Sequence, residues 1–493
     1  MTALDGLFFG LSIALDLQNI LLCLAGVLLG TLVGTLPGIG PMATISIFLP
    51  LTYKITDPSG ALIFLAAIFY GAQYGSSTSA ILLRMPGEPS SMMTALDGNE
   101  LAKKGKAGTA LSIAALSSFF AGIVSALVVA FATIPLSDII YLFGPVEYTS
   151  LLLFGLIAAA SLGGDIFKST AMLCVGILLG MVGTDITTGS VRFAFGVPEL
   201  IDGINFVLVA MGIFGLGEIF YNSLHGQIFK KKIQKLIHLY PSKKILKKSF
   251  APACRGTFLG CILGILPGTA SVVSAFAAYA FEKFFLKKTD SLGKGNIAGV
   301  AAPEAANNAA AQTSFVPLFG LGIPCTALMT LMAAAMLMHG VTPGPQLLSN
   351  SPQIFWGVVG SMLIGNLFLI ILNFPLIRVW IRLLELPMIY VYLVGFLVCV
   401  TGTFYLNNNL FDVLVLLLLG LFGYILRVLD CSPAPLIMGM LLGPLLEENF
   451  KRALIVEQGN LLAFVTKPLS LVFLVCTLIF IIARYCKFIK KKY

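Results

Sequence analysis

The sequence predicts an all-α polytopic membrane protein with about 10–12 transmembrane helices, some of them re-entrant or broken, in two inverted-topology repeats. Three observations lead to this prediction: the apolar composition, the lengths of the apolar runs, and a Pro-Gly motif that occurs twice. Together they predict that the bilayer, and not water, surrounds most of the chain.

The composition is too apolar for a surface that faces water. Of the 493 residues, 58% are hydrophobic and 11% are charged, and the mean hydropathy is +0.97. Soluble domains average about 25% charged residues. A chain this long would therefore lack the charged residues needed to cover a soluble core.

The apolar runs have the length of a bilayer crossing, which takes about 20 helical residues. They are continuous blocks of Leu, Ile, Val, Ala and Gly without the two-residue alternation of a membrane barrel, so they predict helices. The clearest runs are residues 18–36, 61–83, 107–134, 203–222, 354–376, 385–404, 410–427 and 462–484.

The net charge of +9 is concentrated in a few short segments between or after apolar runs. Residues 230–248 carry eight lysines and no acid, and further basic groups lie at 103–106, 283–294 and 484–492. The positive-inside rule places such segments on the cytoplasmic side of the membrane. The charge thus indicates membrane topology and not nucleic-acid binding.

The chain contains a weak internal duplication. The segment GTLVGTLPG at 30–38 matches GCILGILPG at 260–268 at an offset of 230, and the sequence around Pro86 resembles the sequence around Pro324 at an offset of 238. We therefore expect a first membrane repeat over residues 1–229, a basic cytoplasmic linker over 230–250, and a second membrane repeat over 251–493.

The two Pro-Gly pairs, Pro37-Gly38 and Pro267-Gly268, interrupt apolar runs at corresponding positions. Proline ends a helix, and glycine permits backbone conformations that a helix does not use. Residues 256–285 have basic segments on both sides, which favours a hairpin that enters the membrane and returns. The stretch around Pro37 lacks basic flanks, as an opposite orientation would require. The simpler alternative is a kink in two long spanning helices.

Four consecutive hydroxyl residues lie inside an apolar run: Ser76, Ser77, Thr78 and Ser79. Hydroxyl groups can donate hydrogen bonds to a carboxylate without burying a full charge, so they are candidates for substrate binding. Small residues that allow close helix packing, with hydroxyls bonded to the preceding turn, are an equally good explanation.

A second break follows at Pro86-Gly87, between Arg84 and Glu88. Backbone amides exposed near Gly87 could bind an anion. Arg84 could bind an anionic substrate as well, but pairing with Glu88 or anchoring at the membrane surface is the favoured interpretation.

The strongest polar group in the second half begins with Pro303-Glu304 and continues with Asn307 and Asn308 in a run of alanines. A capped helix at the membrane edge would explain the first pair. Buried amides need partners, so the two asparagines favour a binding site: their carbonyls could bind a cation such as Na⁺, and their amides a carboxylate. Thr313, Ser314 and the break at Pro324 complete the candidate set.

Nothing in the sequence supports an enzyme. It contains no GxSxG, HExxH or nucleotide-binding P-loop motif, and its three histidines lie far apart. No catalytic residue or bound cofactor is predicted. A transporter without an ATP site must draw its energy from an ion gradient.

Four long motifs resemble the large membrane subunit of the tripartite tricarboxylate transporter family, the TctA type. The first two are GTLVGTLPGIGPMATISIFLPLTY at 30–53 and YGSSTSAILLRMPGEPSSMMTAL, which starts at Tyr74 and continues to residue 111. The others are LPGTASVVSAFAAYAFEK at 266–283 and the GKGNIAGVAAPEAANN segment that runs from 293 to 348. The resemblance extends over nearly the whole chain.

The resemblance implies a multi-pass protein of the bacterial inner membrane that takes up di- or tricarboxylates such as citrate, coupled to Na⁺ or H⁺. It also implies two partners, a periplasmic solute-binding protein and a small membrane subunit. The alternatives are an ion channel, a stand-alone carboxylate carrier without a binding protein, and an intramembrane enzyme or scaffold. By the matching motifs, the Pro-Gly pairs would be broken-helix tips, and Ser76 to Ser79, Pro86-Gly87 and Glu304 to Asn308 the polar lining.

Overall fold

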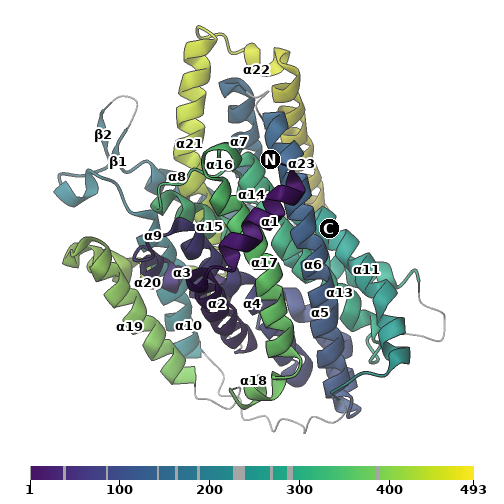
Figure 1. The fold of residues 1–493 in the computed structure, drawn as a ribbon. Coiled ribbons are helices and arrows are strands. Elements are labelled where there is room, and N and C mark those ends of the chain that lie inside the picture. The colour runs from purple at the N-terminus through teal and green to yellow at the C-terminus, as the bar shows by residue number, and fades with distance from the viewer. Residues whose placement is uncertain are drawn as a thin grey trace.

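The computed structural model describes residues 2–36, 40–84, 87–140, 144–160, 165–185, 189–225, 239–266, 270–285, 292–383 and 388–492. These residues are almost entirely helical, and one short hairpin of two antiparallel strands projects from the helices (Figure 1). The predicted all-α class is therefore confirmed.

The first part of the chain, up to residue 225, forms the following elements. They are α1 (Ala3–Ala14), α2 (Leu17–Thr35), α3 (Pro41–Thr52), α4 (Pro58–Leu83), the 3₁₀ turn η1 (Pro89–Ser91), α5 (Met92–Lys103), α6 (Ala107–Ile140), α7 (Pro145–Ala159), α8 (Ile166–Gly180), β1 (Gly183–Thr184), β2 (Val191–Arg192), the 3₁₀ turn η2 (Pro198–Leu200), α9 (Phe206–Ala210), the π-helical η3 (Met211–Leu216) and α10 (Gly217–His225).

The remaining elements begin inside the predicted basic linker. They are α11 (Lys243–Ile265), α12 (Ala270–Glu282), α13 (Ala298–Thr313), α14 (Phe315–Leu321), α15 (Ala327–Met338), α16 (Gln346–Asn350), α17 (Pro352–Asn373), α18 (Ile377–Leu383), α19 (Met388–Asn407), α20 (Leu410–Val428), α21 (Ala434–Val456), α22 (Ala463–Thr466) and α23 (Pro468–Lys492). The helix α11 begins at Lys243, within the predicted basic linker of residues 230–250, and lysine is a good helix former.

Local sequence explains where several helices begin. The side chains of Asp16, Asp57 and Asp165 each accept hydrogen bonds from backbone amides of the first turn of the following helix. Thr2 and Asp5 form a reciprocal capping box at the start of α1. These short polar residues satisfy amides that have no partner within the helix.

Five of the described helices are long and apolar enough to cross a membrane: Leu17–Thr35, Ala107–Ser137, Phe206–His225, Pro352–Asn373 and Leu410–Val428. Eight shorter apolar helices of 10–17 residues accompany them. The outward faces of the peripheral helices are apolar; in α20, for example, Leu414, Leu418 and Leu421 are more than half exposed. Such faces suit contact with lipid.

A glycine stripe packs one helix closely against another in each half of the chain. Gly26, Gly30 and Gly34 of α2 lie against the backbone of α4 near Phe64, Ile68 and Ala72. In the second half, Gly256, Gly260 and Gly264 of α11 lie in the same way against α13 near Ala302, Ala306 and Ala310. The glycines match at the offset of 230 and their contacts at 238, the two offsets found in the sequence. The duplicated sequence therefore builds the same helix pair twice; the inverted orientation of the repeats stays a prediction.

Each half also packs against the other half in a reciprocal way. In α4, Tyr70 lies 3.2 Å from Ser361 Oγ of α17, and Tyr74 donates a hydrogen bond to Asn366 of α17. At the matching positions of α13, Asn308 donates to Ser118 of α6 at 2.7 Å, and Gln312 accepts from Ser125 of α6 at 2.8 Å. The central helix of each half is thus held by a helix of the other half.

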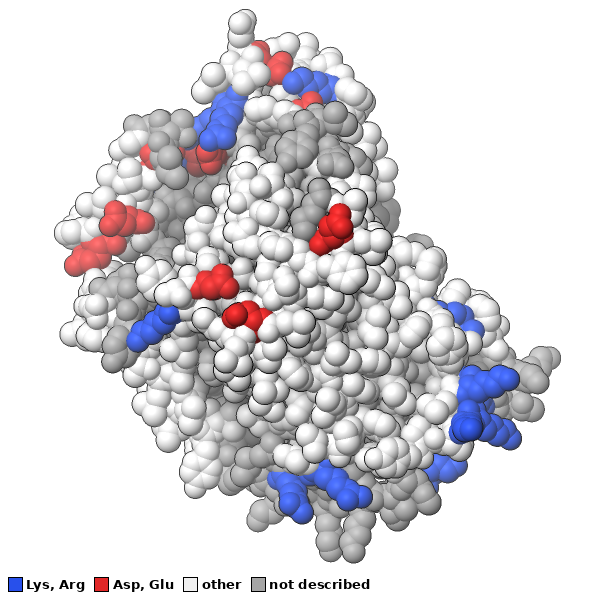
Figure 2. Space-filling model, in the orientation of Figure 1, with Lys and Arg blue, Asp and Glu red and all other residues white. Residues whose placement is uncertain are grey.

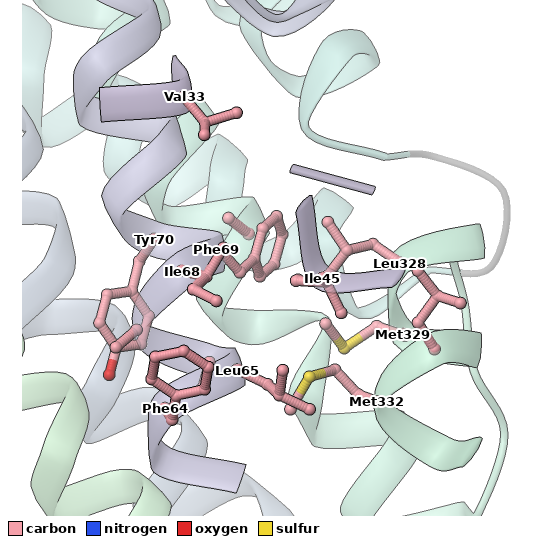
Figure 3. Close-up of a cluster of buried hydrophobic side chains, with 14 of the residues drawn as sticks. Val33, Ile45, Phe64, Leu65, Ile68, Phe69, Tyr70, Leu328, Met329 and Met332 are labelled. Carbon is pink, nitrogen blue, oxygen red and sulfur yellow. The ribbon is translucent and has the colours of Figure 1, made fainter. Parts of the chain in front are cut away.

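The apolar core also crosses between the halves. Figure 3 shows side chains of α4, among them Leu65 and Phe69, near Ile45 of α3 and near Met329 and Met332 of α15. Residues from positions 45 and 332 of the chain thus share one core. This arrangement places α4 in the interior, where its polar residues cannot reach bulk water.

Charged side chains are unevenly distributed over the surface. On the face in Figure 2, the lower edge carries only Lys and Arg among its charged side chains, whereas the Asp and Glu side chains lie over the middle and upper parts, with further Lys and Arg among them at the top. This separation is the pattern that the positive-inside rule describes.

Candidate functional site

The centre of the molecule contains two helices that are buried along their length. All sixteen residues of α13 are buried, as are nearly all residues of α4. Both helices carry polar side chains at these positions, although buried polar groups without partners are energetically costly. The polar groups of α4 and α13 therefore need a structural or functional reason to be there.

Ser77 of α4 and Glu304 of α13 connect the two central helices. The Ser77 hydroxyl donates a hydrogen bond of 2.6 Å to Glu304 Oε2, and both side chains are buried. Thr94 of α5 and Ser118 of α6 lie beside the same carboxyl group. Glu304 Oε1 is buried without a hydrogen-bond partner. Two residues predicted as separate candidates thus form one polar site.

The two predicted asparagines differ in their surroundings. Asn308 Nδ2 donates to Ser118 Oγ at 2.7 Å and to the Glu304 carbonyl at 3.1 Å, so its amide nitrogen is engaged in the fold. Asn307 is fully buried, and neither its amide nitrogen nor its oxygen has a partner. Asn307 is therefore the residue whose side chain is free to bind a ligand.

The hydroxyl cluster of α4 divides into residues bonded within the first half of the chain and residues that line a cavity. Ser76 bonds to Ser91 Oγ at 2.6 Å and to the Gln73 carbonyl at 2.9 Å, and Ser79 donates to the Ser76 carbonyl at 3.2 Å. The Ser76–Ser91 contact holds η1 against α4, and the other two lie within α4. Ser77 and Thr78 instead line a small cavity, with a volume of about 10 Å³, next to Glu304.

Thr313 and Ser314 bond to their own helix. Their hydroxyls donate to the carbonyls of Ala309, at 2.9 Å, and Ala311, at 2.6 Å. A hydroxyl bonded to its own helix offsets the energetic cost of its burial without a ligand. The structural explanation therefore accounts for these two predicted site residues.

Each half brings its second break next to the end of its first helix. Gly87 lies against the Gly34 carbonyl at the end of α2. Pro324 lies in the segment between α14 and α15, where Gly322 has a positive φ of 73° and Cys325 Sγ contacts the Ile265 carbonyl of α11 at 3.7 Å. The predicted residues Pro37, Gly38, Pro86, Pro267 and Gly268 lie outside the described residues.

Of the two favoured interpretations of Arg84, the described residues do not show the pair with Glu88, whereas anchoring at the membrane surface stays a prediction. Arg84 is exposed, ends α4 in the left-handed conformation with φ 60°, and shares none of the ion pairs described among the placed residues with Glu88. Glu88 Oε2 is buried without a partner. Two side chains four residues apart in a continuous helix would lie on the same face. Arg84 and Glu88 instead have different surroundings, because the helix ends at Arg84.

Sequence reasoning missed Asp97, the most extensively bonded carboxylate in the described structure. Asp97 is fully buried in α5 and accepts hydrogen bonds from the amides of Gly293, Gly295 and Asn296 at 2.7–2.9 Å and from the Tyr279 hydroxyl at 2.8 Å. It joins the first half to the loop before α13. Its position beside the basic segment at 103–106 made it resemble an ordinary loop acid.

No cluster of three or more His, Cys, Asp or Glu side chains is placed to hold a metal ion in the part of the chain that the structure describes. A Na⁺ ion bound by carbonyl and hydroxyl oxygens would not need such a cluster. Asn307 Oδ1 and Glu304 Oε1 are the buried oxygens of α13 that lack a partner.

The fold and the buried polar centre define an all-α polytopic membrane protein. A family model described as the tripartite tricarboxylate transporter TctA family matches residues 20–438. The chain belongs to this family, as the sequence motifs suggested, and the family is one of transporters and not of enzymes.

Two relatives in Agrobacterium vitis bear names without a function. One, an "uncharacterized 52.8 kDa protein in TAR-I ttuC' 3'region", is 46% identical over 473 residues, which cover 95% of this chain and 94% of the relative. The other, an "uncharacterized protein in TAR-II ttuC' 3'region", is 46% identical over 211 residues, covering 43% of this chain and 87% of the relative. No solved structure matches the chain.

Proposed function

We propose that this chain is the substrate-translocating subunit of a secondary transporter that takes up di- or tricarboxylates, such as citrate, across the bacterial inner membrane. The proposal rests mainly on the unpartnered amide of Asn307. This amide is buried at the centre of a duplicated fold, one helical turn from the Glu304 that Ser77 contacts. Membership of a transporter family gives the class of activity.

The chemistry around Asn307 suits an organic anion. Its amide can donate two hydrogen bonds, and its neighbours on α4 offer hydroxyl groups that donate without adding charge. Neutral donors and helix ends bind a carboxylate while leaving it able to move on, which a buried ion pair would hinder. The Pro-Gly tips are proposed to complete the site with backbone amides.

The family supports a proposal for two partners, and the charge distribution supports a proposal for the orientation in the membrane. We expect a periplasmic solute-binding protein to deliver the substrate and a small membrane subunit to complete the transporter. The lower edge in Figure 2, which carries Lys and Arg, would face the cytoplasm. The binding protein would then dock at the opposite end, where the β1–β2 hairpin and the loop after α21 project (Figure 1).

The energy would come from a gradient of Na⁺ or H⁺. Asn307 Oδ1 and Glu304 Oε1 are one helical turn apart and both lack a partner, so a cation could bind between them. Asn308, which was predicted to share this role, has its amide nitrogen engaged with Ser118.

The test is uptake of radiolabelled carboxylates by proteoliposomes that contain the purified transporter with both partners. Asn307→Ala removes the free amide, and we expect it to lower uptake at least tenfold, since a hydrogen bond to a charged group contributes about 1.5–3 kcal/mol. Thr133→Val is the matched control, because Thr133 is equally buried but bonds only to its own helix at 2.7 Å. Equal uptake by the two variants would contradict the proposed site.

The same vesicles separate the alternatives. A carrier exchanges internal for external substrate and accumulates it against a gradient, whereas a channel only lets it equilibrate. A stand-alone carrier would work without the binding protein. A scaffold or an intramembrane enzyme would show no flux that depends on substrate.

A further inference from the structure

The Glu304 carboxyl group is buried at the centre of the molecule without a cation. It is fully buried, its Oε2 accepts one hydrogen bond from Ser77, and its Oε1 has none. Lys and Arg form ion pairs with other acids in the described residues, but none of these pairs includes Glu304. An ionised carboxylate in such a place is strongly disfavoured, so the group needs a proton or a bound cation.

The titratable groups that surround Glu304 supply no compensating charge. Tyr74 of α4 and Glu88 before η1 interact with it electrostatically, and Glu88 adds a second buried carboxyl oxygen without a partner. Among the described residues on the elements packed against α13, Asp97 bonds to Tyr279 and backbone amides, Arg255 pairs with Glu282, and Glu100 pairs with Lys103. The four lysines at 243–248 are exposed at the start of α11, and Tyr70, Cys254 and Cys261 bring no cation. Two neighbouring carboxyl groups without a cation favour at least one bound proton.

A route for that proton begins at the Ser77 hydroxyl. Ser77 lines the cavity of about 10 Å³ together with Tyr74, Thr78, Ser118 and Asn373. Asn373 Oδ1 is buried in the same region without a partner. A cavity of this size with several polar groups holds about one water molecule. A water there, bonded to Ser77, would connect the carboxyl group to the end of α17.

Substrate and proton would be coupled through the neighbouring position of α13. Asn307, the residue with a free amide, lies one turn from Glu304 on the same helix, and side chains three residues apart are neighbours. An anionic substrate at Asn307 and an ionised Glu304 would repel each other in a medium of low dielectric constant. The substrate therefore binds well only when Glu304 carries a proton.

We propose that Glu304 carries one proton inward with each anionic substrate molecule. The proton comes from water on the outer side, forms an O–H bond with the carboxylate, and leaves to water on the cytoplasmic side after the substrate has gone. No other bond is formed or broken. This inference rests on the proposed transport function and makes H⁺, and not Na⁺, the coupling ion.

The test compares two activities of the complete transporter in Na⁺-free proteoliposomes: exchange of labelled carboxylate without a gradient, and accumulation driven by a pH gradient that is alkaline inside. Glu304→Gln imitates the protonated acid, so exchange should stay within about threefold of wild type while accumulation is lost. Glu304→Asp should retain part of the accumulation. Glu88→Gln shows whether the neighbouring carboxyl group carries the proton instead of Glu304. Glu100→Gln is the control and should accumulate substrate as wild type does, because Glu100 pairs with Lys103 at the surface.

Several results would overturn the inference. One is pH-driven accumulation by Glu304→Gln at the wild-type level, and another is its loss in Glu88→Gln while Glu304→Gln retains it. Wild-type accumulation that requires Na⁺ and ignores the pH gradient would overturn it while leaving the transport function intact. Absence of wild-type exchange with every acid would instead refute transport itself, and this inference with it.

A second measurement does not require a variant that folds. Addition of substrate to the wild-type complex in weakly buffered detergent solution should raise the pH of the medium, because binding takes up protons, approaching one per site at alkaline pH. No proton uptake at any pH between about 6 and 9 would contradict the role of Glu304.

Discussion

At the scale of single residues, buried carboxylates in this protein have two different environments. Asp97 accepts hydrogen bonds from four donors, three backbone amides and one phenol, and so has the surroundings of a structural anion. Glu304 has a single hydroxyl donor and a free oxygen. A carboxylate whose hydrogen-bond acceptors are all occupied is stabilised in its charged form, whereas a carboxylate with an unoccupied acceptor can change its protonation state. From this difference we infer a structural role for Asp97, and it is the reason for proposing Glu304 as the functional group.

Replacement of Asp97 by Asn should destabilise the protein by about 2–3 kcal/mol, because charge-assisted hydrogen bonds to the loop before α13 are lost. Thermal unfolding in detergent should show a lower Tm, and hydrogen exchange at Gly293 to Asn296 should become faster. Glu100→Gln, on the same helix but paired only with Lys103 at the surface, should change neither. An unchanged exchange rate at Gly293 would contradict the assignment.

At the scale of elements, glycine stripes set the distance between the helices of each central pair. A Cβ at Gly30 would come within 2.9 Å of the Ile68 backbone, and a Cβ at Gly260 within 2.8 Å of Ala306 Cα. Real side chains do not approach so closely, so only glycine permits these contacts. Close backbone approach through small residues is a common way for helices to associate in lipid.

Gly30→Ala and Gly260→Ala should each destabilise the protein by about 1–3 kcal/mol, because the helices must separate to accept the methyl group. The measurement is the Tm of each variant in detergent. Gly155→Ala serves as the control, since its Cβ would meet Ile323 at an ordinary 3.4 Å. Similar Tm values for all three variants would show that the glycine stripes are not close contacts.

A second element, the β1–β2 hairpin, is attached to α21 by ion pairs. Arg192 Nη1 lies 2.9 Å from Glu447 Oε1, and Lys451 lies 2.7 Å from the same oxygen. The pKa of Glu447 is below its ordinary value of 4.5, because Lys451 and then Arg192 donate hydrogen bonds to the carboxylate. The stabilisation is therefore present above pH 4.5 and is lost as the pH falls through the lowered pKa.

Glu447→Gln should make the hairpin more sensitive to pepsin at pH 5, by up to about fivefold, since a partly exposed ion pair contributes about 1 kcal/mol or less. Wild type and variant should converge at a pH low enough to protonate the wild-type carboxylate, below its lowered pKa. Because the activity of pepsin depends on pH, the variant is compared with wild type at the same pH. Glu448→Gln, which loses only an exposed pair with Arg452, should behave as wild type at both values.

At the scale of the whole molecule, the two halves depend on each other. The central helix of the first half bonds to α17 through Tyr74 and Asn366, and that of the second half bonds to α6 through Gln312 and Ser125. Each half alone would leave such polar groups, and an apolar core shared across the halves, without partners. The molecule is thus one folding unit built from a duplicated sequence.

Expression of residues 1–229 and 239–493 as two separate chains tests this dependence. We expect the chains to copurify as a stable complex when expressed together, and each to aggregate when expressed alone. Size-exclusion chromatography in detergent distinguishes these results. A single, monodisperse peak for either half alone would contradict the interlocked arrangement.

The sequence predicted the helical class and the repeated helix pair, because these leave periodic or local signals, and it proposed the Glu304 region from the polar residues in an alanine run. Runs of apolar residues and the repeated glycines around Gly34 and Gly264 are visible without a structure. The same signals could not show which polar residues bond to their own helix. Asn307 and Asn308 are adjacent and chemically identical, and only the position of Ser118 separates them.

Contacts between distant segments were beyond sequence reasoning. Ser77 and Glu304 were both candidates, but nothing in either motif showed that one would donate to the other across 227 positions. Asp97 was missed for the same reason, since its partners lie in the loop before α13. The expected pairing of Arg84 with Glu88 assumed a local contact that the helix break removes.

The most direct test of the central site is a cryo-electron microscopy map of the complete transporter with a bound carboxylate. We predict density for the ligand within hydrogen-bonding distance of the Asn307 amide, with the Pro37-Gly38 and Pro267-Gly268 segments on either side of it. Ligand density elsewhere, with Gly38 and Gly268 facing lipid and far from Asn307, would contradict the site.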